Sequence, residues 1–86
     1  MKIDQEVIDR MAVRVIRGRN ERNVTRQQLA DSMGRDIVYV IQLEDGQIEP
    51  ELPDLVAMGK FLDIPIMEFF GPQDNPVLAN LLQDFK

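Results

Sequence analysis

Apolar residues recur three and four positions apart along most of the chain, which is the spacing of a helix with one buried face. The first such run follows Asp4, an expected N-cap, and comprises Ile8, Met11, Ala12 and Val15. We expect this helix to reach about Arg22. A later run lies beyond Pro50 and Pro53 and predicts another helix through Leu55, Val56, Met58, Phe61 and Leu62.

Short polar signals mark the ends of a second helix. Thr25 and Gln28 stand three positions apart, which is the pattern of a capping box, and the apolar residues of the helix follow directly. Gly34 comes after that run and suits a helix C-terminus. The sequence therefore predicts a short helix with sharp limits.

The segment from Asp36 to Glu44 gives conflicting signals. Asp36 is a suitable helix N-cap, but the five residues after it are Ile-Val-Tyr-Val-Ile, whose intrinsic preference is for a buried strand. Local propensity alone predicts a strand here, whereas the helices on both sides favour a third helix.

Two short segments complete the pattern. A fifth helix is expected over Ile66–Phe70, ended by Gly71-Pro72, because proline is accepted in a first helical turn but not within a helix. Asn75-Pro76 then opens a sixth, amphipathic helix whose apolar face comprises Val77, Leu78, Leu81, Leu82 and Phe85. We expect a globular domain over residues 1–71 and a C-terminal helix within residues 72–86.

Composition narrows the classes of function. The 86 residues suffice for one small domain, and they include no cysteine and no histidine. Without these side chains the chain has no thiolate nucleophile, imidazole base or ordinary zinc site, and it has no glycine-rich phosphate loop. We expect no enzyme, no metal and no cofactor. No apolar stretch is long enough for a bilayer or a secretory signal, so the cytoplasm is the expected location.

Charge is unevenly distributed about a formal net charge of −5. Residues 1–35 hold eight Lys and Arg against five Asp and Glu, whereas residues 36–86 hold two against ten. An acidic chain is a poor general ligand for nucleic acid, since phosphate contacts supply most non-specific affinity. A basic stripe within the N-terminal part can still bind phosphate.

The ordered set of helix and turn residues resembles the phage-repressor type of helix-turn-helix, the lambda-repressor-like or XRE family, over about residues 8–70. It implies an all-α, five-helix domain in which Asp36 to Glu44 form the third helix, and an ion pair between Arg19 and Glu44. The resemblance rests on Arg19, Thr25, Leu29-Ala30, Gly34, Val40, Leu43-Glu44-x-Gly46, Pro50, Leu52, Leu55, Leu62, Ile64 and Ile66.

The resemblance also implies a DNA interface centred on the third helix, which this family inserts into the major groove. The positions that would face the bases are Asp36, Ile37, Val38, Ile41 and Gln42, and Gln47 follows in the next loop. Gln42 matches base-edge hydrogen-bonding patterns, whereas the aliphatic side chains can contact only a thymine methyl group. Phosphate contacts are expected from Arg35 and from residues beside the start of the second helix, namely Arg22, Arg26 and Gln27.

These features leave more than one function open. The first hypothesis is a transcriptional regulator that binds double-stranded DNA as a homodimer, with the apolar face of residues 77–85 as the expected dimer contact. Packing of that face onto its own domain is the alternative. The second hypothesis is a helix-turn-helix domain used as a protein-interaction module through Ile37, Val38 and Ile41. An antitoxin-type regulator, which binds both its operator and a partner toxin, lies between the two.

Overall fold

Residues 4–70 are described by the structure, a computed structural model of the chain, and within them every regular element is helical and no strand occurs. The predicted all-α class is therefore confirmed for this part of the chain. These residues form α1 (Gln5–Glu21), α2 (Arg26–Met33), α3 (Ile37–Glu44), α4 (Leu52–Leu62) and the 3-10 helix η1 (Ile66–Phe70). The predicted C-terminal helix and its residues Val77, Leu78, Leu81, Leu82 and Phe85 lie outside the described residues.

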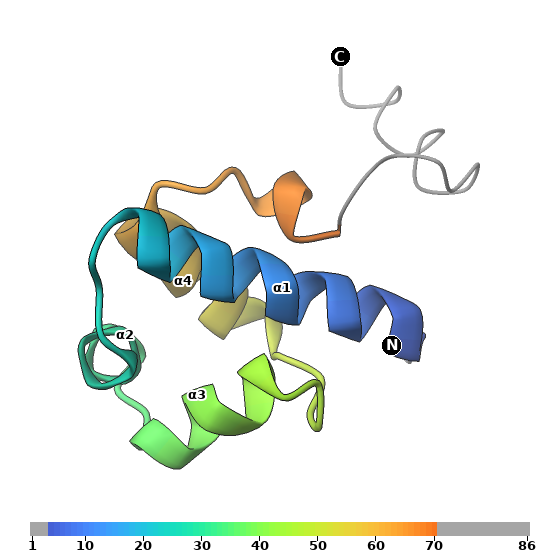
Figure 1. Ribbon diagram of the computed structural model, residues 1–86, viewed down its shortest axis with the longest axis horizontal. Coiled ribbons are helices and arrows are strands. Elements are labelled where there is room, and N and C mark those ends of the chain that lie inside the picture. The colour runs from blue at the N-terminus through green and yellow to red at the C-terminus, as the bar shows by residue number, and fades with distance from the viewer. Residues whose placement is uncertain (1–3, 71–86) are drawn as a thin grey trace.

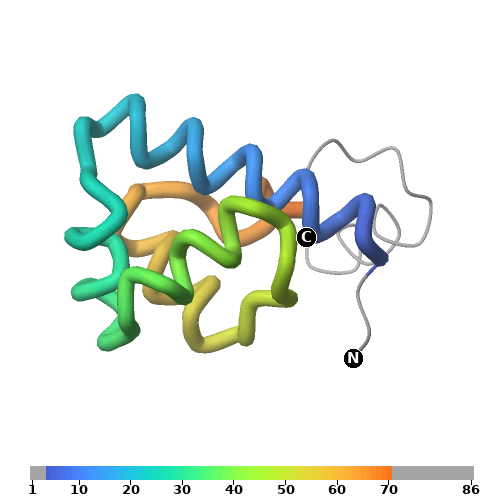
Figure 2. Tube along the Cα trace, turned by 60° about the horizontal axis from the view of Figure 1, so that its bottom comes forward, coloured from blue at the N-terminus to red at the C-terminus, as the bar shows by residue number. Residues whose placement is uncertain are grey.

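The longest helix, α1, lies across the other elements (Figure 1). It packs against α3 and η1, while α2 packs against α3 and α4. Figure 2 shows α2 and α3 following each other beneath α1. Because α2 and α3 share their most extensive contact with each other, they act as one unit that α1 and α4 hold in place.

The ambiguous segment is a helix, as the surrounding pattern and the resemblance favoured and its own propensity did not. The Asp36 carboxylate caps it by accepting a hydrogen bond from the Val38 N–H at 2.9 Å. Val40 and Leu43 point into the core. An isolated helix of eight residues is marginal in water, so burial of these side chains must stabilise the helix against its strand propensity.

The fifth element differs from the prediction of an α-helix. Ile66–Phe70 forms a 3-10 helix, so residues 4–70 contain four α-helices rather than five. The Glu68 N–H donates to the Pro65 carbonyl at 2.8 Å, which is the tighter i to i+3 bond of a 3-10 turn. A five-residue segment is too short to repay α-helix nucleation, and it serves to place Phe69 in the core.

One hydrophobic core joins all five elements. Leu29, Val40, Met58, Leu62 and Phe69 are almost completely excluded from solvent, together with further buried side chains from Met11 to Ile64. Two acidic residues, Glu44 and Asp54, are buried as well. Their partners, described below, lie on α1, α2 and α3 and in the turn between α2 and α3. Within residues 4–70, every helix falls short of the length and apolar character that a membrane crossing needs.

Candidate nucleic-acid interface

Both ends of α2 are defined by caps. At the start of α2 the capping box is formed, because Thr25 Oγ1 accepts from the Gln28 N–H at 3.0 Å and Gln28 Oε1 accepts from the Thr25 N–H at 2.9 Å. Gly34 ends α2 with a φ of +67°, a conformation that favours glycine. The Arg35 N–H then donates to the Ala30 carbonyl at 2.9 Å. The sequence signals at both ends of α2 thus correspond to the observed caps.

The outward face of α3 carries the residues predicted to read DNA. Val38 is 53% exposed, Asp36 is exposed, and Ile37, Ile41 and Gln42 are half-buried. The Gln42 side chain makes no hydrogen bond within residues 4–70, so its amide keeps its donors and acceptor for a ligand. The Asp36 carboxylate, in contrast, is occupied as the cap of α3. The accessible surface is therefore a mainly aliphatic strip with one amide.

Two arginines converge on the buried Glu44 at the end of α3. Arg19 donates from Nε to Glu44 Oε2 at 2.7 Å and from Nη2 to Oε1 at 3.1 Å, which is the pair that the resemblance implies. Arg26 donates from Nε to the same Oε1 at 2.9 Å. One carboxylate thus faces two guanidinium groups, so the cluster carries a formal charge of +1.

That surplus charge lies beside the N-terminus of α2. The Glu44 side chain is buried while that of Arg26 is nearly half exposed, so the positive charge faces solvent there. An open depression occupies this place, lined by Arg19, Asn23, Val24, Thr25, Arg26, Gln27 and Ile37. The first two backbone N–H groups of α2, those of Arg26 and Gln27, have no carbonyl partner within residues 4–70. The depression therefore offers donors and positive charge to an anion.

Arg35, which the sequence predicts to contact phosphate, has its partners within the protein. Its Nη2 donates to Asp54 Oδ2 and to Glu51 Oε2, both at 2.9 Å, and its guanidinium lies 4.5 Å from the centre of the Tyr39 ring. The Tyr39 hydroxyl donates to the same Asp54 oxygen at 2.6 Å. This cluster joins the turn and α3 to the start of α4. A contact of Arg35 with phosphate stays a prediction, and the two carboxylates compete with phosphate for the guanidinium.

The pKa of Tyr39 reflects its burial and its hydrogen bond within this cluster. Burial of the ring, together with the hydrogen bond to Asp54, raises the pKa of Tyr39 to about 12 from 10.0. The folded state thus holds the phenol proton more tightly than the unfolded state, and the resulting stability is fully present below pH 10 and is lost as the pH rises towards 12.

We therefore expect Tyr39 to ionise late in an absorbance titration, together with a loss of helical circular dichroism. The signal is unambiguous because the chain has one tyrosine and no tryptophan. The Asp54→Asn variant, which lacks the charged acceptor, should ionise at lower pH than the wild type. Ionisation of the folded wild type near pH 10 would contradict the description of this cluster.

The remaining predicted residues lie at the edges of this surface. Arg22 donates to Asp63 Oδ2 at 3.1 Å, and both side chains are largely exposed, so water and salt weaken this pair. Gln27 donates from its side chain to Asp31 at 2.9 Å, and Gln47 is exposed in the loop after α3. The structure thus brings Arg26, Gln27 and Ile37 together around one depression. Arg22 lies elsewhere, in the weak ion pair with Asp63, and Arg35 is held by its ion pair with Asp54 of α4.

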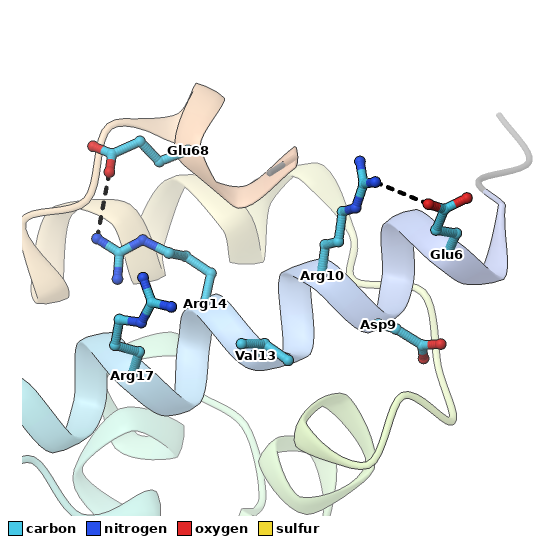
Figure 3. A pocket seen from close by; sticks show the side chains of 7 residues that line it. All are labelled: Glu6, Asp9, Arg10, Val13, Arg14, Arg17 and Glu68. Atoms are coloured by element: carbon cyan, nitrogen blue, oxygen red, sulfur yellow. Dashed lines mark hydrogen bonds and ion pairs between the residues drawn. The ribbon is translucent and has the colours of Figure 1, made fainter. Parts of the chain in front are cut away.

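A second depression, not predicted from the sequence, lies along α1 (Figure 3). It is lined by Glu6, Asp9, Arg10, Val13, Arg14, Arg17 and Glu68. Figure 3 shows Arg10 reaching Glu6 within α1 and Arg14 reaching across from α1 to Glu68 of η1. Three arginines and three acidic residues line it, so this surface has no net formal charge to attract phosphate. The helical spacing of Arg10, Arg14 and Arg17 was the one available sequence signal for it.

No family model and no curated protein matches this chain. Within residues 4–70, the acidic side chains form no cluster of three or more that could hold a metal ion. The assignment of function therefore rests on the α2–α3 unit itself.

Proposed function

We propose that this chain is a transcriptional regulator that binds double-stranded DNA as a homodimer, with α3 in the major groove. The observation that carries the proposal is the α2–turn–α3 unit, whose second helix keeps one face outside the core. A helix of this diameter fits the major groove, and the residues on its outer face are then the ones that meet base edges. The resemblance of residues 8–70 to phage repressors supports the same reading.

The electrostatics beside α2 support a phosphate contact at the edge of that groove. Arg26 carries the positive charge that Glu44 leaves unbalanced, and two backbone N–H groups of α2 are without partners. Glu44 also holds Arg26 at Nε, which orients the rest of the guanidinium before DNA arrives. A pre-oriented side chain loses less entropy on binding, so Arg26 is the strongest phosphate-binding residue in this proposal.

Base recognition by this α3 differs from that of a polar recognition helix. Gln42 can pair with adenine N6 and N7, and Ile37, Val38 and Ile41 can contact thymine methyl groups. We therefore propose sites rich in A·T pairs, with part of the selectivity supplied by DNA shape.

Selection of bound fragments from a genomic pool tests this proposal. We expect recovery of A·T-rich sites, and we expect Gln42→Ala to relax the preference at one base position by about 1–3 kcal/mol while other positions are unchanged. Unselective recovery by the wild type, or an unchanged preference in Gln42→Ala, would contradict base reading by α3.

The exposure of Val38 favours a second candidate function, a protein-interaction module. An exposed aliphatic strip formed by Ile37, Val38 and Ile41 is the kind of surface that a partner protein covers. An antitoxin-type regulator would bind its operator through this strip and its partner toxin through a different surface. Changing Ile37 and Ile41 together to serine separates the candidates, because an interaction module then loses its partner whereas a DNA-binding domain keeps its phosphate contacts.

A further inference from the structure

Among the helices in residues 4–70, α4 carries the most exposed large hydrophobic residues. Leu52 is 64% exposed, Val56 is 40% exposed and Phe61 is 43% exposed, which makes three of the five exposed large hydrophobic residues in this part of the chain. Pro53 is also exposed and Ala57 is half-buried. Together with Lys60, these residues occupy positions 52 and 53, 56 and 57, and 60 and 61, so they share one side of the helix. We refer to this side as the α4 face.

We propose that the α4 face is the contact between two copies of this chain, related by a two-fold axis; this rests on the homodimer of the proposed function. A two-fold contact must be complementary to itself. When two copies of α4 run antiparallel with their midpoints between residues 56 and 57 aligned, Leu52 lies opposite Phe61 and Val56 lies opposite Ala57. Each large apolar side chain on the face then meets an apolar partner.

The charges on and beside the α4 face fit the same arrangement. Lys60 near the end of α4 is the one charged residue among the positions of the face, and Glu51 stands at the N-cap position of the helix. Antiparallel packing brings Lys60 of each copy towards Glu51 of the second copy. The two helix dipoles are also opposed, which is favourable at short range. A face with this little charge suits a second copy of an acidic chain better than it suits DNA, whose affinity depends on several cations.

The α4 face also includes a shallow hollow. It lies between α2 and α4 and is lined by Ser32, Pro53, Val56, Ala57, Lys60 and Phe61. Under the two-fold arrangement, exposed apolar side chains of the second copy can enter this hollow, and those of the first copy can enter the corresponding hollow of the second. The α3 face carrying Val38 does not take part, because a different helix forms this contact. Association through α4 therefore leaves the proposed DNA-reading surface uncovered.

Sedimentation equilibrium of the full chain tests the contact in the absence of DNA. We expect a dimer for the wild type and a rise in its dissociation constant of roughly a hundredfold in Val56→Glu, because two like charges then meet at the axis. Val13→Glu is the matched control, since Val13 is 56% exposed but lies on α1, and it should remain dimeric. A monomeric wild type, or a Val56→Glu variant that dimerises as tightly as the wild type, would overturn the proposal.

Charge reversal identifies the partner of Lys60. Lys60→Glu and Glu51→Lys should each weaken the dimer, and the double variant should recover most of the lost affinity. The comparison with the double variant is needed because Glu51 also accepts a hydrogen bond from Arg35. A double variant weaker than both single variants would overturn the antiparallel register.

A further full-length variant distinguishes the α4 face from the segment after residue 75. Leu78→Asp with Leu82→Asp removes the apolar character of that segment and should leave the α4 dimer intact. Conversion of this variant to a monomer would assign the contact to that segment and overturn the proposal. DNA binding is measured separately, so a dimer that binds no DNA refutes the proposed DNA binding alone, and a DNA-binding dimer that Val56→Glu does not weaken refutes the α4 contact alone.

Discussion

Replacing Glu44 with glutamine is expected to lower the free energy of unfolding by about 3–5 kcal/mol, as is typical when one partner of a buried ion pair is removed. The amide keeps the shape of the side chain but removes the single negative charge that faces Arg19 and Arg26. Arg19 is itself largely buried and has one other partner, the Val24 carbonyl at 3.1 Å. Small domains have a total stability of about 5–15 kcal/mol, so the variant should be close to unfolding.

Urea unfolding followed by circular dichroism measures this loss at fixed protein concentration. Glu6→Gln is the matched control, because Glu6 also accepts from an arginine, Arg10 at 2.8 Å, but its side chain is largely exposed. Exposed pairs contribute about 0–1 kcal/mol, so the control should unfold with nearly wild-type stability. A loss in Glu44→Gln no larger than that of the control would contradict the role assigned to the cluster.

Truncation of the core beneath α2 and α3 is the second change with a large expected effect. Leu29→Ala should cost about 2–5 kcal/mol, because the side chain is fully buried and its removal leaves a cavity as well as a loss of apolar burial. Val40→Ala should cost roughly 2 kcal/mol, since it removes two buried carbon atoms from α3. Both losses should appear as earlier midpoints in the same urea experiment.

Val38→Ala is the control that separates burial from helix propensity. It makes the same chemical change as Val40→Ala two positions away on α3, but at an exposed side chain. Alanine has the higher helix propensity, so this variant should be as stable as the wild type or slightly more stable. Equal losses at residues 38 and 40 would contradict the orientation of α3.

The sequence predicted the features that depend on neighbouring residues. The capping box of Thr25 and Gln28, the glycine turn at Gly34 and the Asp36 cap each involve side chains within a few positions of their partners, so their patterns are legible in the chain. The helical state of residues 37–44 depends instead on burial against other elements. Residue order alone could not resolve it, and the family resemblance was needed.

The ion-pair partners of Arg26 and Arg35, two of the predicted phosphate-binding arginines, could not be predicted from neighbouring residues. Arg26 meets Glu44 across 18 positions, and Arg35 meets Asp54 across 19, so both pairs arise from the packing of whole helices. Their expected consequences for the proposed phosphate contacts are opposite. Glu44 is shared with Arg19 and leaves positive charge at Arg26, whereas Asp54 and Glu51 together more than balance the charge of Arg35.

The salt dependence of DNA affinity tests the central claim most directly. With Arg22 and Arg26 of each subunit on phosphate, a dimer neutralises four phosphates, and the logarithm of affinity should fall against the logarithm of salt concentration with a slope of about −3.6. Arg26→Ala should flatten the slope to about −1.8 and weaken binding to all sequences alike. Arg19 continues to pair with Glu44 in this variant, so the fold is retained.

Arg17→Ala is the control for loss of a surface cation, because Arg17 lies on α1 in the depression away from α2. Fluorescence anisotropy with a selected DNA fragment, measured over a range of salt concentrations, gives the three slopes in one series. We expect Arg17→Ala to share the wild-type slope and Arg26→Ala to have half that slope. No saturable binding by the wild type at low salt, or an Arg26→Ala slope equal to that of the wild type, would contradict docking of α2 and α3 on DNA.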